Sequence, residues 1–458
     1  MRALHRALCV VALLAACGGD DDSSPGADGG GGGGEDGGPI GGDPAVIFDE
    51  STIFTYELDV EQADWDWLNE NATLEQYVPA TLHFEGETWP EIGIRYKGGY
   101  GSLYTCFDSQ GNQTCDKLSI KLGFDEYDPE GRFYGLKKLN FHSMEADPSH
   151  MHDSIVYKLF RDQDVPAPRT AYARLVVNGE LQGLFVVVEQ IDGRFTRARF
   201  PDGGEGNLYK EVWPEHTTEQ PYLDALETNE DEAPTADKMV RFAQALAAAG
   251  EEGFAGVLED WMDVDQLVRY MAVARLVDHW DDIIAFYCVG AQPCFNHNYY
   301  WYESTSEDRV WLIAWDVDHT FEEPSPVRTY FGMPDWDDTE ADCTPVDIFL
   351  GVQGRAPACD PFIRGMATQL WDRYAAASQA LLDGDFAVDA MNARIDSCTT
   401  SSTRRWPRIP TARRSASGPP RSTRCATSWS TSAAGWKPSS RRLSHHSIIR
   451  HISAAHFF

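Results

Sequence analysis

The segment from residue 296 to residue 321 reads NHNYYWYESTSEDRVWLIAWDVDHTF and decides the fold class of its surroundings. Two apolar runs, at residues 299–302 and 310–315, flank a polar turn, which predicts a β-hairpin. Asn298 heads the first predicted strand, and Asp316 and Asp318 follow the second. Adjacent antiparallel strands can bring such residues together at one end of a hairpin. We therefore expect these three polar side chains to form one group.

A fourth polar residue, Asp281, stands just past a predicted helix on the N-terminal side of the hairpin. An acid, an amide and an acid in this order are what phosphoryl-transfer enzymes use to position a hydroxyl and hold Mg²⁺, and hard cations prefer oxygen ligands. Any one of these acids is better explained as a solvated turn or strand-end residue. That explanation weakens for the whole set, which is embedded among four tryptophans: Trp280, Trp301, Trp311 and Trp315.

The periodicity of the apolar residues changes along the chain. Residues 46–96, 117–124 and 171–191 alternate in the manner of strands, and Asn178-Gly179 predicts a tight hairpin inside the last of these. A helix is expected at 60–72, and another from Pro148 to residue 163. The apolar spacing becomes helical over 235–250 and 263–280. Strands, then helices, then a charged hairpin predict an α+β fold with two lobes.

The N-terminal segment predicts export. Residues 1–17 have a charged start, a short apolar run and a Leu-Ala-Ala-Cys ending, which resembles a bacterial lipoprotein signal with lipidation at Cys17. Residues 18–44 are rich in Gly and Asp and read as a flexible linker. We expect a body at residues 45–396, anchored by lipid to a membrane of the bacterial cell envelope and facing the periplasm or the cell surface. An ordinary signal peptide with an incidental cysteine is the alternative.

Charge and cysteine content restrict partner and compartment. The net charge of −34 argues against nucleic acid as a partner. Six cysteines are near neighbours in sequence, which predicts local disulfides in an oxidising compartment, with the pairing left open. No CxxC spacing indicates zinc. The six are Cys106, Cys115, Cys288, Cys294, Cys343 and Cys359.

The last segment, residues 397–458, has an anomalous composition. It contains ten Arg, one Lys and no Asp or Glu, and it lacks hydrophobic periodicity. A basic tail that docks on anionic lipid is one interpretation. We favour a reading-frame slip in GC-rich DNA, and we expect resequencing of the locus to restore an acidic, amphipathic C-terminus.

Several separated blocks resemble one family in order and spacing. The blocks are RYKGG (95–99), the long stretch at 117–195, GNLYK (206–210), HWDD (279–282), HNYYWY (297–302) and AWDVDHTF (314–321). Together they resemble the spore coat protein H (CotH) kinase-like family over roughly residues 46–350. The resemblance implies an atypical protein-kinase-like, two-lobed fold and transfer of the γ-phosphoryl group of ATP to protein Ser, Thr or Tyr hydroxyls. It also implies a Mg²⁺ or Mn²⁺ cofactor, and we expect a monomer.

The resemblance also implies roles for the polar group. Asp281 would accept the proton of the substrate hydroxyl. Asn298 and Asp316 would hold the divalent metal, with Asp318 as a possible helper. The segment IIAFYCVGAQPCF (283–295) intervenes where the family has a short gap, so Asn298 keeps its place only if this insert forms a side loop, for instance through Cys288 and Cys294.

Four further residues would serve the nucleotide according to the same resemblance. Lys121 would neutralise the ATP phosphates. Arg95 and Gly98 lie where the family has a signature near the nucleotide, although RYKGGYGS differs from the usual form. Glu189 lies where the chain passes between lobes.

Two other functions stay open on the sequence alone. The run VWLIAWDVDHTF also resembles the first motif of haloacid-dehalogenase-like phosphatases, with Asp316 as nucleophile, Asp318 as general acid and Asp337 or Asp338 as metal ligand. That motif normally opens a parallel sheet rather than closing a domain. A catalytically inactive kinase-like protein used for binding or adhesion at the cell surface is the third possibility.

Overall fold

The computed structural model describes residues 43–99, 103–230, 234–290, 293–321, 334–349 and 352–403. Several predictions lie outside these ranges: the signal peptide with Cys17, almost all of the linker, and the basic segment from residue 404 on. The helix α10 (Val388–Thr403) runs across residue 396, the predicted end of the body. Within the described ranges, every helix is too short or too polar to cross a membrane.

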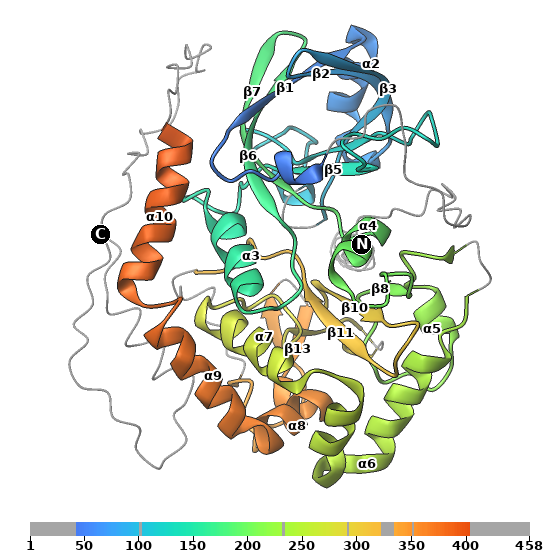
Figure 1. The fold of residues 1–458 in the computed structure, drawn as a ribbon, viewed down its shortest axis with the longest axis vertical. Coiled ribbons are helices and arrows are strands. Elements are labelled where there is room, and N and C mark those ends of the chain that lie inside the picture. Colours follow the sequence, from blue (N-terminus) through green and yellow to red (C-terminus); the bar gives the residue numbers. More distant parts are fainter. Residues whose placement is uncertain are drawn as a thin grey trace.

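Seven strands of the N-terminal half close into a barrel in the order β1-β2-β3-β4-β5-β7-β6 (Figure 1). Neighbouring strands are antiparallel except for β1 and β6, which pair in parallel and close the barrel. The helix α2 (Gln62–Glu70) follows β1. The strands are β1 (Phe54–Val60), β2 (Val78–Phe84), β3 (Glu87–Tyr96), β4 (Ile120–Gly123), β5 (Lys138–His142), β6 (Thr170–Val177) and β7 (Glu180–Val188).

Alternation of side chains explains the barrel. Leu82, Ile94, Leu122 and Phe141 are fully buried in one cluster that fills it, as expected when every second residue of a strand faces the same side. The predicted Asn178-Gly179 hairpin is confirmed between β6 and β7. Both turn residues have positive φ (51° and 78°), which two-residue hairpin turns require.

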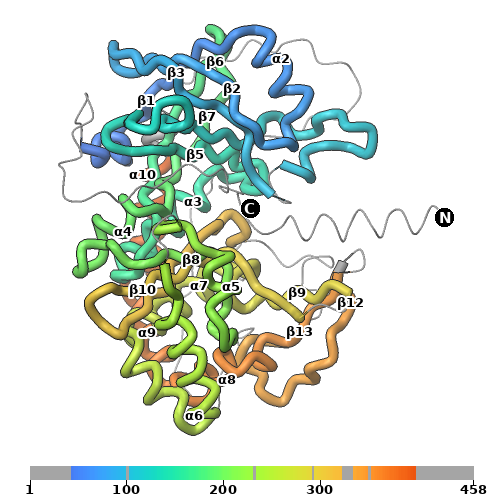
Figure 2. The backbone as a smooth tube through the Cα atoms, turned by 90° about the vertical axis from the view of Figure 1, so that its right-hand side faces the viewer, coloured from blue at the N-terminus to red at the C-terminus, as the bar shows by residue number. Residues whose placement is uncertain are grey.

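The second half of the chain combines helices with two small sheets below the barrel (Figures 1 and 2). One sheet has the order β11-β10-β8 and the other β12-β13-β9. The predicted hairpin is confirmed, because β10 and β11 pair in antiparallel register. The strands are β8 (Leu208–Lys210), β9 (Phe286–Cys288), β10 (Tyr299–Glu303), β11 (Val310–Ala314), β12 (Val346–Phe349) and β13 (Val352–Arg355).

The helices of this half pack around the β10–β11 sheet, and their apolar faces form a second core with Trp301 and Tyr299 at its centre. Both predicted helical stretches are present, as α6 and α7, with a kink in α6 at Gly250. The α+β class is therefore confirmed. The helices that contribute to this core are α3 (His152–Asp162), which lies between β5 and β6 in the chain, α4 (Gly193–Arg199), α5 (Gln220–Leu223), α6 (Asp237–Trp261), α7 (Val264–Leu276), α8 (Pro361–Gln369) and α9 (Trp371–Asp383).

The start of α3 differs from the sequence prediction. The helix begins at His152 rather than at Pro148. The Asp147 carboxylate accepts hydrogen bonds from the backbone N–H groups of Ser149, Met151 and His152, so these residues form a capped turn instead of a helical one. The turn places His152 and Asp153 at the helix start, beside the end of β11.

The expectation of local disulfides is confirmed for all six cysteines. The pairs are Cys106–Cys115, Cys288–Cys294 and Cys343–Cys359.

Candidate active site

The β10–β11 hairpin positions two residues of the predicted site. Tyr299 pairs with Ala314 at the end of the ladder, so Asn298 and Asp316 both lie just beyond it. Both have positive φ, 65° and 49°, which is uncommon for residues other than glycine. The hydroxyl oxygen of Tyr157 in α3 accepts a hydrogen bond from the backbone N–H of Asp316 at 3.0 Å, and Nε2 of His279 donates to its carbonyl at 3.0 Å. The backbone of Asp316 is thus held from two sides.

Asp281 and Asn298 are in direct contact. Nδ2 of Asn298 donates to the backbone carbonyl of Asp281 at 2.8 Å and to its Oδ2 at 3.2 Å. The described parts of the intervening segment, 283–290 and 293–295, are joined by the Cys288–Cys294 disulfide. Since Nδ2 serves Asp281, Oδ1 is the side-chain atom of Asn298 that could coordinate a cation.

The carboxylate of Asp281 forms a partly buried ion pair. Nε2 of His297 lies 2.7 Å from Oδ1, and the hydroxyl of Tyr287 donates to the same oxygen. Burial opposes ionisation, but the charge and hydrogen bond of His297 prevail and hold the pKa of Asp281 far below its usual range. Burial likewise lowers the pKa of His297, and the Asp281 charge overrides it and raises that pKa to about 9. Near neutral pH the pair is therefore charged.

The pKa values of Asp316 and Asp318 are raised, in contrast to the lowered pKa of Asp281. Burial, followed by the neighbouring Asp318 charge, raises the pKa of Asp316 to about 6, against the pull of His142 and Lys97. The pKa of Asp318 is raised too, first by burial, with further contributions from Asp153 and Asp281. Buried carboxylates that repel one another lose free energy unless a proton or a cation joins them. This is an environment in which a divalent cation would be stabilised.

The oxygen donors around Asp316 fit Mg²⁺ or Mn²⁺ if water or substrate supplies the remaining ligands. Among the described residues, no group of three or more His, Cys, Asp or Glu side chains is arranged to hold a metal. A cation here would need the Asn298 amide oxygen together with the carboxylates of Asp316 and Asp318, and it would need ligands from outside the protein. Mg²⁺ is commonly bound in this manner, through one or two carboxylates, waters and substrate phosphates.

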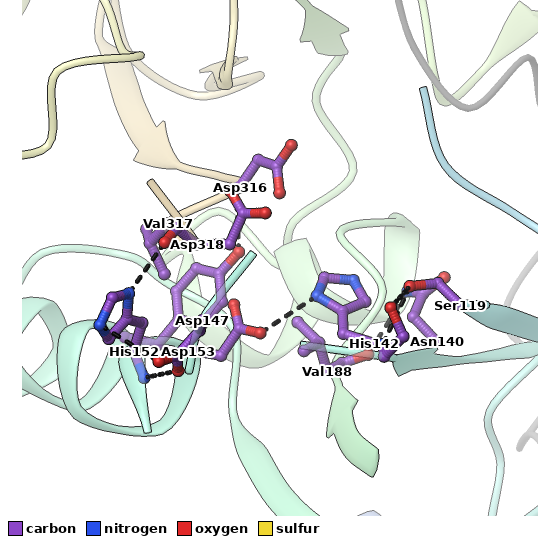
Figure 3. Close-up of polar contacts among 12 residues, drawn as sticks. Ser119, Asn140, His142, Asp147, His152, Asp153, Val188, Asp316, Val317 and Asp318 are labelled. Carbon is purple, nitrogen blue, oxygen red and sulfur yellow. Dashed lines mark hydrogen bonds and ion pairs between the residues drawn. The ribbon is translucent and has the colours of Figure 1, made fainter. Parts of the chain in front are cut away.

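Three residues not singled out from the sequence belong to the same group: His142 and Asp153, which Figure 3 shows, and Lys97. Nδ1 of His142 lies 3.3 Å from the carboxylate of Asp153, and Nζ of Lys97 lies 3.4 Å from Nε2 of His142. Nζ of Lys97 also lies 5.6 Å from the ring centroid of Trp315. The charge of Lys97 acts on Asp316, so this lysine brings positive charge to an acidic cluster.

Lys121 belongs to the face of the barrel that carries these residues. It pairs with Arg95 of β3 and with Asn140 of β5, and its side chain is completely buried. Lys97 and His142 each stand two residues further along these strands, and residues two apart share a face. Lys121 therefore lies one step along the sheet from Lys97, and the structure offers two lysines where the sequence indicated one.

Comparisons with known proteins show the family to which the chain belongs. The model of the family described as CotH kinase protein matches residues 94–432. The chain belongs to this family. The chain is 22% identical over 284 residues to inner spore coat protein H of Bacillus subtilis (strain 168). The aligned region covers 59% of the chain and 70% of that relative. It is 22% identical over 210 residues to the invasin CotH7 of Rhizopus delemar, covering 42% of the chain and 32% of that relative.

The extent of the CotH match differs from the predicted body. It begins within β3, so β1 and β2 precede it, and it ends beyond residue 396, inside the basic segment.

Two predicted nucleotide residues of this CotH chain are engaged in internal ion pairs. The guanidinium of Arg95 donates to Glu75 and lies 5.2 Å from the ring centroid of Tyr77. Glu189 is buried between Arg169 and Arg199. Burial favours its neutral form, but the two arginines hold the pKa of Glu189 below its usual value.

These ion pairs give Arg95 and Glu189 structural roles that do not require a nucleotide. Gly98 has a φ of 118°, which suits glycine and turns the chain directly after Lys97.

The phosphatase alternative conflicts with the sheet topology. β11, which carries the Asp-x-Asp motif, belongs to a sheet whose strand pairs are antiparallel. The described strands that follow it, β12 and β13, join β9 in a second antiparallel sheet. The phosphatase motif needs a parallel sheet after it, and the described residues contain none there.

Proposed function

We propose that this CotH-family protein is an atypical kinase with a two-lobed, protein-kinase-like fold, which transfers the γ-phosphoryl group of ATP to hydroxyl groups of proteins. The observation that carries the proposal is the convergence of Asp281, Asn298 and Asp316 at one end of the β10–β11 hairpin. The barrel and the helical part have separate hydrophobic cores, which agrees with two lobes.

Each residue has a task that its surroundings support. The Asn298 amide oxygen and the Asp316 carboxylate would hold Mg²⁺ or Mn²⁺, with Asp318 beside them. When bound, the cation would neutralise charge on the phosphoryl oxygens. Lys97 and Lys121 would provide positive charge for the phosphates from the barrel side.

Asp281 would orient the acceptor hydroxyl through a hydrogen bond. An ion-paired carboxylate is a weak base, because its proton affinity is low. Phosphoryl transfer tolerates this, since its loose transition state depends on positioning and charge more than on early proton removal. The hydroxyl proton would then pass to Asp281 as the new bond to phosphorus forms.

We also propose that the protein acts outside the cytoplasm, held to a membrane by lipid on Cys17. Three disulfides support an oxidising compartment.

A second candidate is a surface-binding protein without kinase activity. The strongly acidic pKa of Asp281 and the name of the relative described as an invasin favour this alternative.

Incubation of the purified chain with ATP labelled at the γ-phosphate, in the presence of Mg²⁺ or Mn²⁺, tests the proposal. We expect label on the chain itself or on an added protein, and a loss on the order of 100-fold or more in Asp281→Asn. Asp66→Asn, an exposed aspartate of α2, is the matched control and keeps the wild-type rate. A folded chain that binds ATP but transfers no label would favour the surface-binding alternative.

A further inference from the structure

Two donors converge on a single oxygen of the Asp281 carboxylate. The hydroxyl of Tyr287 and Nε2 of His297 both donate to Oδ1. The other oxygen, Oδ2, faces Nδ2 of Asn298 at 3.2 Å. The rotation of a carboxylate about its last side-chain bond is ordinarily loose. Here two donors on one oxygen and one on the other constrain the plane of the carboxylate relative to Asn298.

Tyr287 comes from the insert that separates Asp281 from Asn298. It lies in β9, and its backbone exchanges hydrogen bonds with Phe295 at 2.8 and 2.9 Å across the loop. On its other side Tyr287 pairs with Gly354 of β13. The Cys288–Cys294 disulfide closes the loop, and Nδ2 of Asn296 donates to the carbonyl of Ile283 at its base. The insert is therefore anchored on both sides, and Tyr287 has little freedom to move.

The ring of Tyr287 also restricts His297. The two rings meet edge to face with centroids 5.2 Å apart. The insert thus acts on Asp281 directly, through the Tyr287 hydroxyl, and indirectly, through the imidazole that completes the ion pair.

We propose that β9, in the insert between Asp281 and Asn298, is a positioning element for Asp281, and that Tyr287 is the residue through which it acts. It holds the plane of the Asp281 carboxylate so that one oxygen points toward Asn298, the side on which the acceptor hydroxyl of the protein substrate would approach. This inference rests on the proposed kinase function for its role in catalysis, while the orientation of the Asp281 carboxylate is a property of the protein alone. Tyr287 is a positioning residue, because it acts through Asp281 and touches no reacting atom.

The substitution Tyr287→Phe removes only the hydroxyl and keeps the ring that packs against His297. We expect kcat to fall by on the order of 10- to 100-fold, because small displacements of a catalytic group are costly, and the KM for ATP to change less than about twofold. The matched control is Tyr302→Phe. Its hydroxyl also donates to an aspartate, Asp202, at 2.8 Å, in a part of β10 remote from Asp281. The control should keep kcat.

Crystal structures of the wild-type chain and of Tyr287→Phe complete the test. We expect one Asp281 carboxylate orientation in the wild type, and a rotated or doubled orientation in the variant. An unchanged carboxylate in the variant overturns the proposal, whatever the activity. A reoriented carboxylate with wild-type kcat overturns its catalytic role. If the wild-type chain transfers no label, the kinase function fails, and the orientation of Asp281 in the variant alone decides whether Tyr287 positions it.

Discussion

A buried carboxyl group in the hairpin strand β10 makes the stability of the protein depend on pH. Glu303 is 7% exposed and lies five residues beyond Asn298. Its Oε1 accepts a hydrogen bond from Nδ2 of Asn207 at 2.8 Å, whereas its Oε2 is buried with no hydrogen-bond partner among the described residues. Burial above all raises the pKa of Glu303 from 4.5 to about 7, against hydrogen bonds from Tyr209 and Asn207 and the charge of Lys238.

The size and sign of the effect follow from that pKa. A carboxyl whose pKa is higher in the folded chain binds its proton more tightly there than in the unfolded chain. The contribution of Glu303 is therefore most favourable below about pH 4.5 and is lost as the pH rises through about 7. The loss amounts to about 3 kcal/mol of unfolding free energy. Glu303→Gln cannot titrate and removes this dependence.

Urea unfolding of the wild type and Glu303→Gln at about pH 4 and about pH 8 measures the effect. The quantity compared is the unfolding free energy of the variant minus that of the wild type. This difference should be about 3 kcal/mol larger at pH 8 than at pH 4. Comparing the two pH values cancels any constant cost of burying the new amide. Glu307→Gln, at an exposed position, is the control and should follow the wild type. Parallel pH profiles for Glu303→Gln and the wild type would refute the reasoning.

Three further predictions concern the site and its supports. Mg²⁺ should raise the melting temperature of the wild type and of Asp66→Asn but not of Asp316→Asn; an equal rise in all three would place the metal elsewhere. Replacing both Cys288 and Cys294 by Ser should cost roughly 2 kcal/mol in urea unfolding, the value for so short a loop, and an unchanged midpoint would contradict it. Glu189→Gln should cost about 2 kcal/mol, because the partly exposed Arg169 and Arg199 lose the charged acceptor that they share; Glu180→Gln, which is exposed, should cost nothing measurable.

The sequence predicted those parts of the fold that depend on local periodicity. The Asn178-Gly179 turn, the helices α6 and α7 and the β10–β11 hairpin are all present. Each has a strong local signal, either a turn that needs positive φ or an apolar stripe of one period. The closure of the barrel was not predicted, because the parallel pairing of β1 with β6 joins segments more than a hundred residues apart.

The predicted start of α3 at Pro148 was wrong, again because a local signal was not sufficient. Pro148 after an aspartate is a common helix start. Here the Asp147 side chain binds three backbone N–H groups in a turn instead. Local sequence does not distinguish these two uses of an aspartate.

In the candidate site, too, residues joined by local structure could be predicted and residues joined by tertiary packing could not. Asn298 and Asp316 could be placed together because they flank one hairpin. Lys97 stands within the quoted RYKGG, two residues after Arg95 and on the same face, but the sequence does not tell which of the two lies nearer the acids. His142 and Asp153 come from β5 and α3 and meet only through tertiary packing. The roles of Asp281, Asn298 and Asp316 in catalysis stay predictions.

The most direct test of the central claim is anomalous diffraction from crystals of the chain grown with Mn²⁺ and a non-hydrolysable ATP analogue. We predict one manganese peak within coordination distance of Oδ1 of Asn298 and of the Asp316 carboxylate, with the analogue's phosphates completing the shell and Asp281 beside the γ-phosphate. A peak at any other group of residues, or bound analogue with no metal near Asp316, would contradict the claim that these residues form one phosphoryl-transfer site.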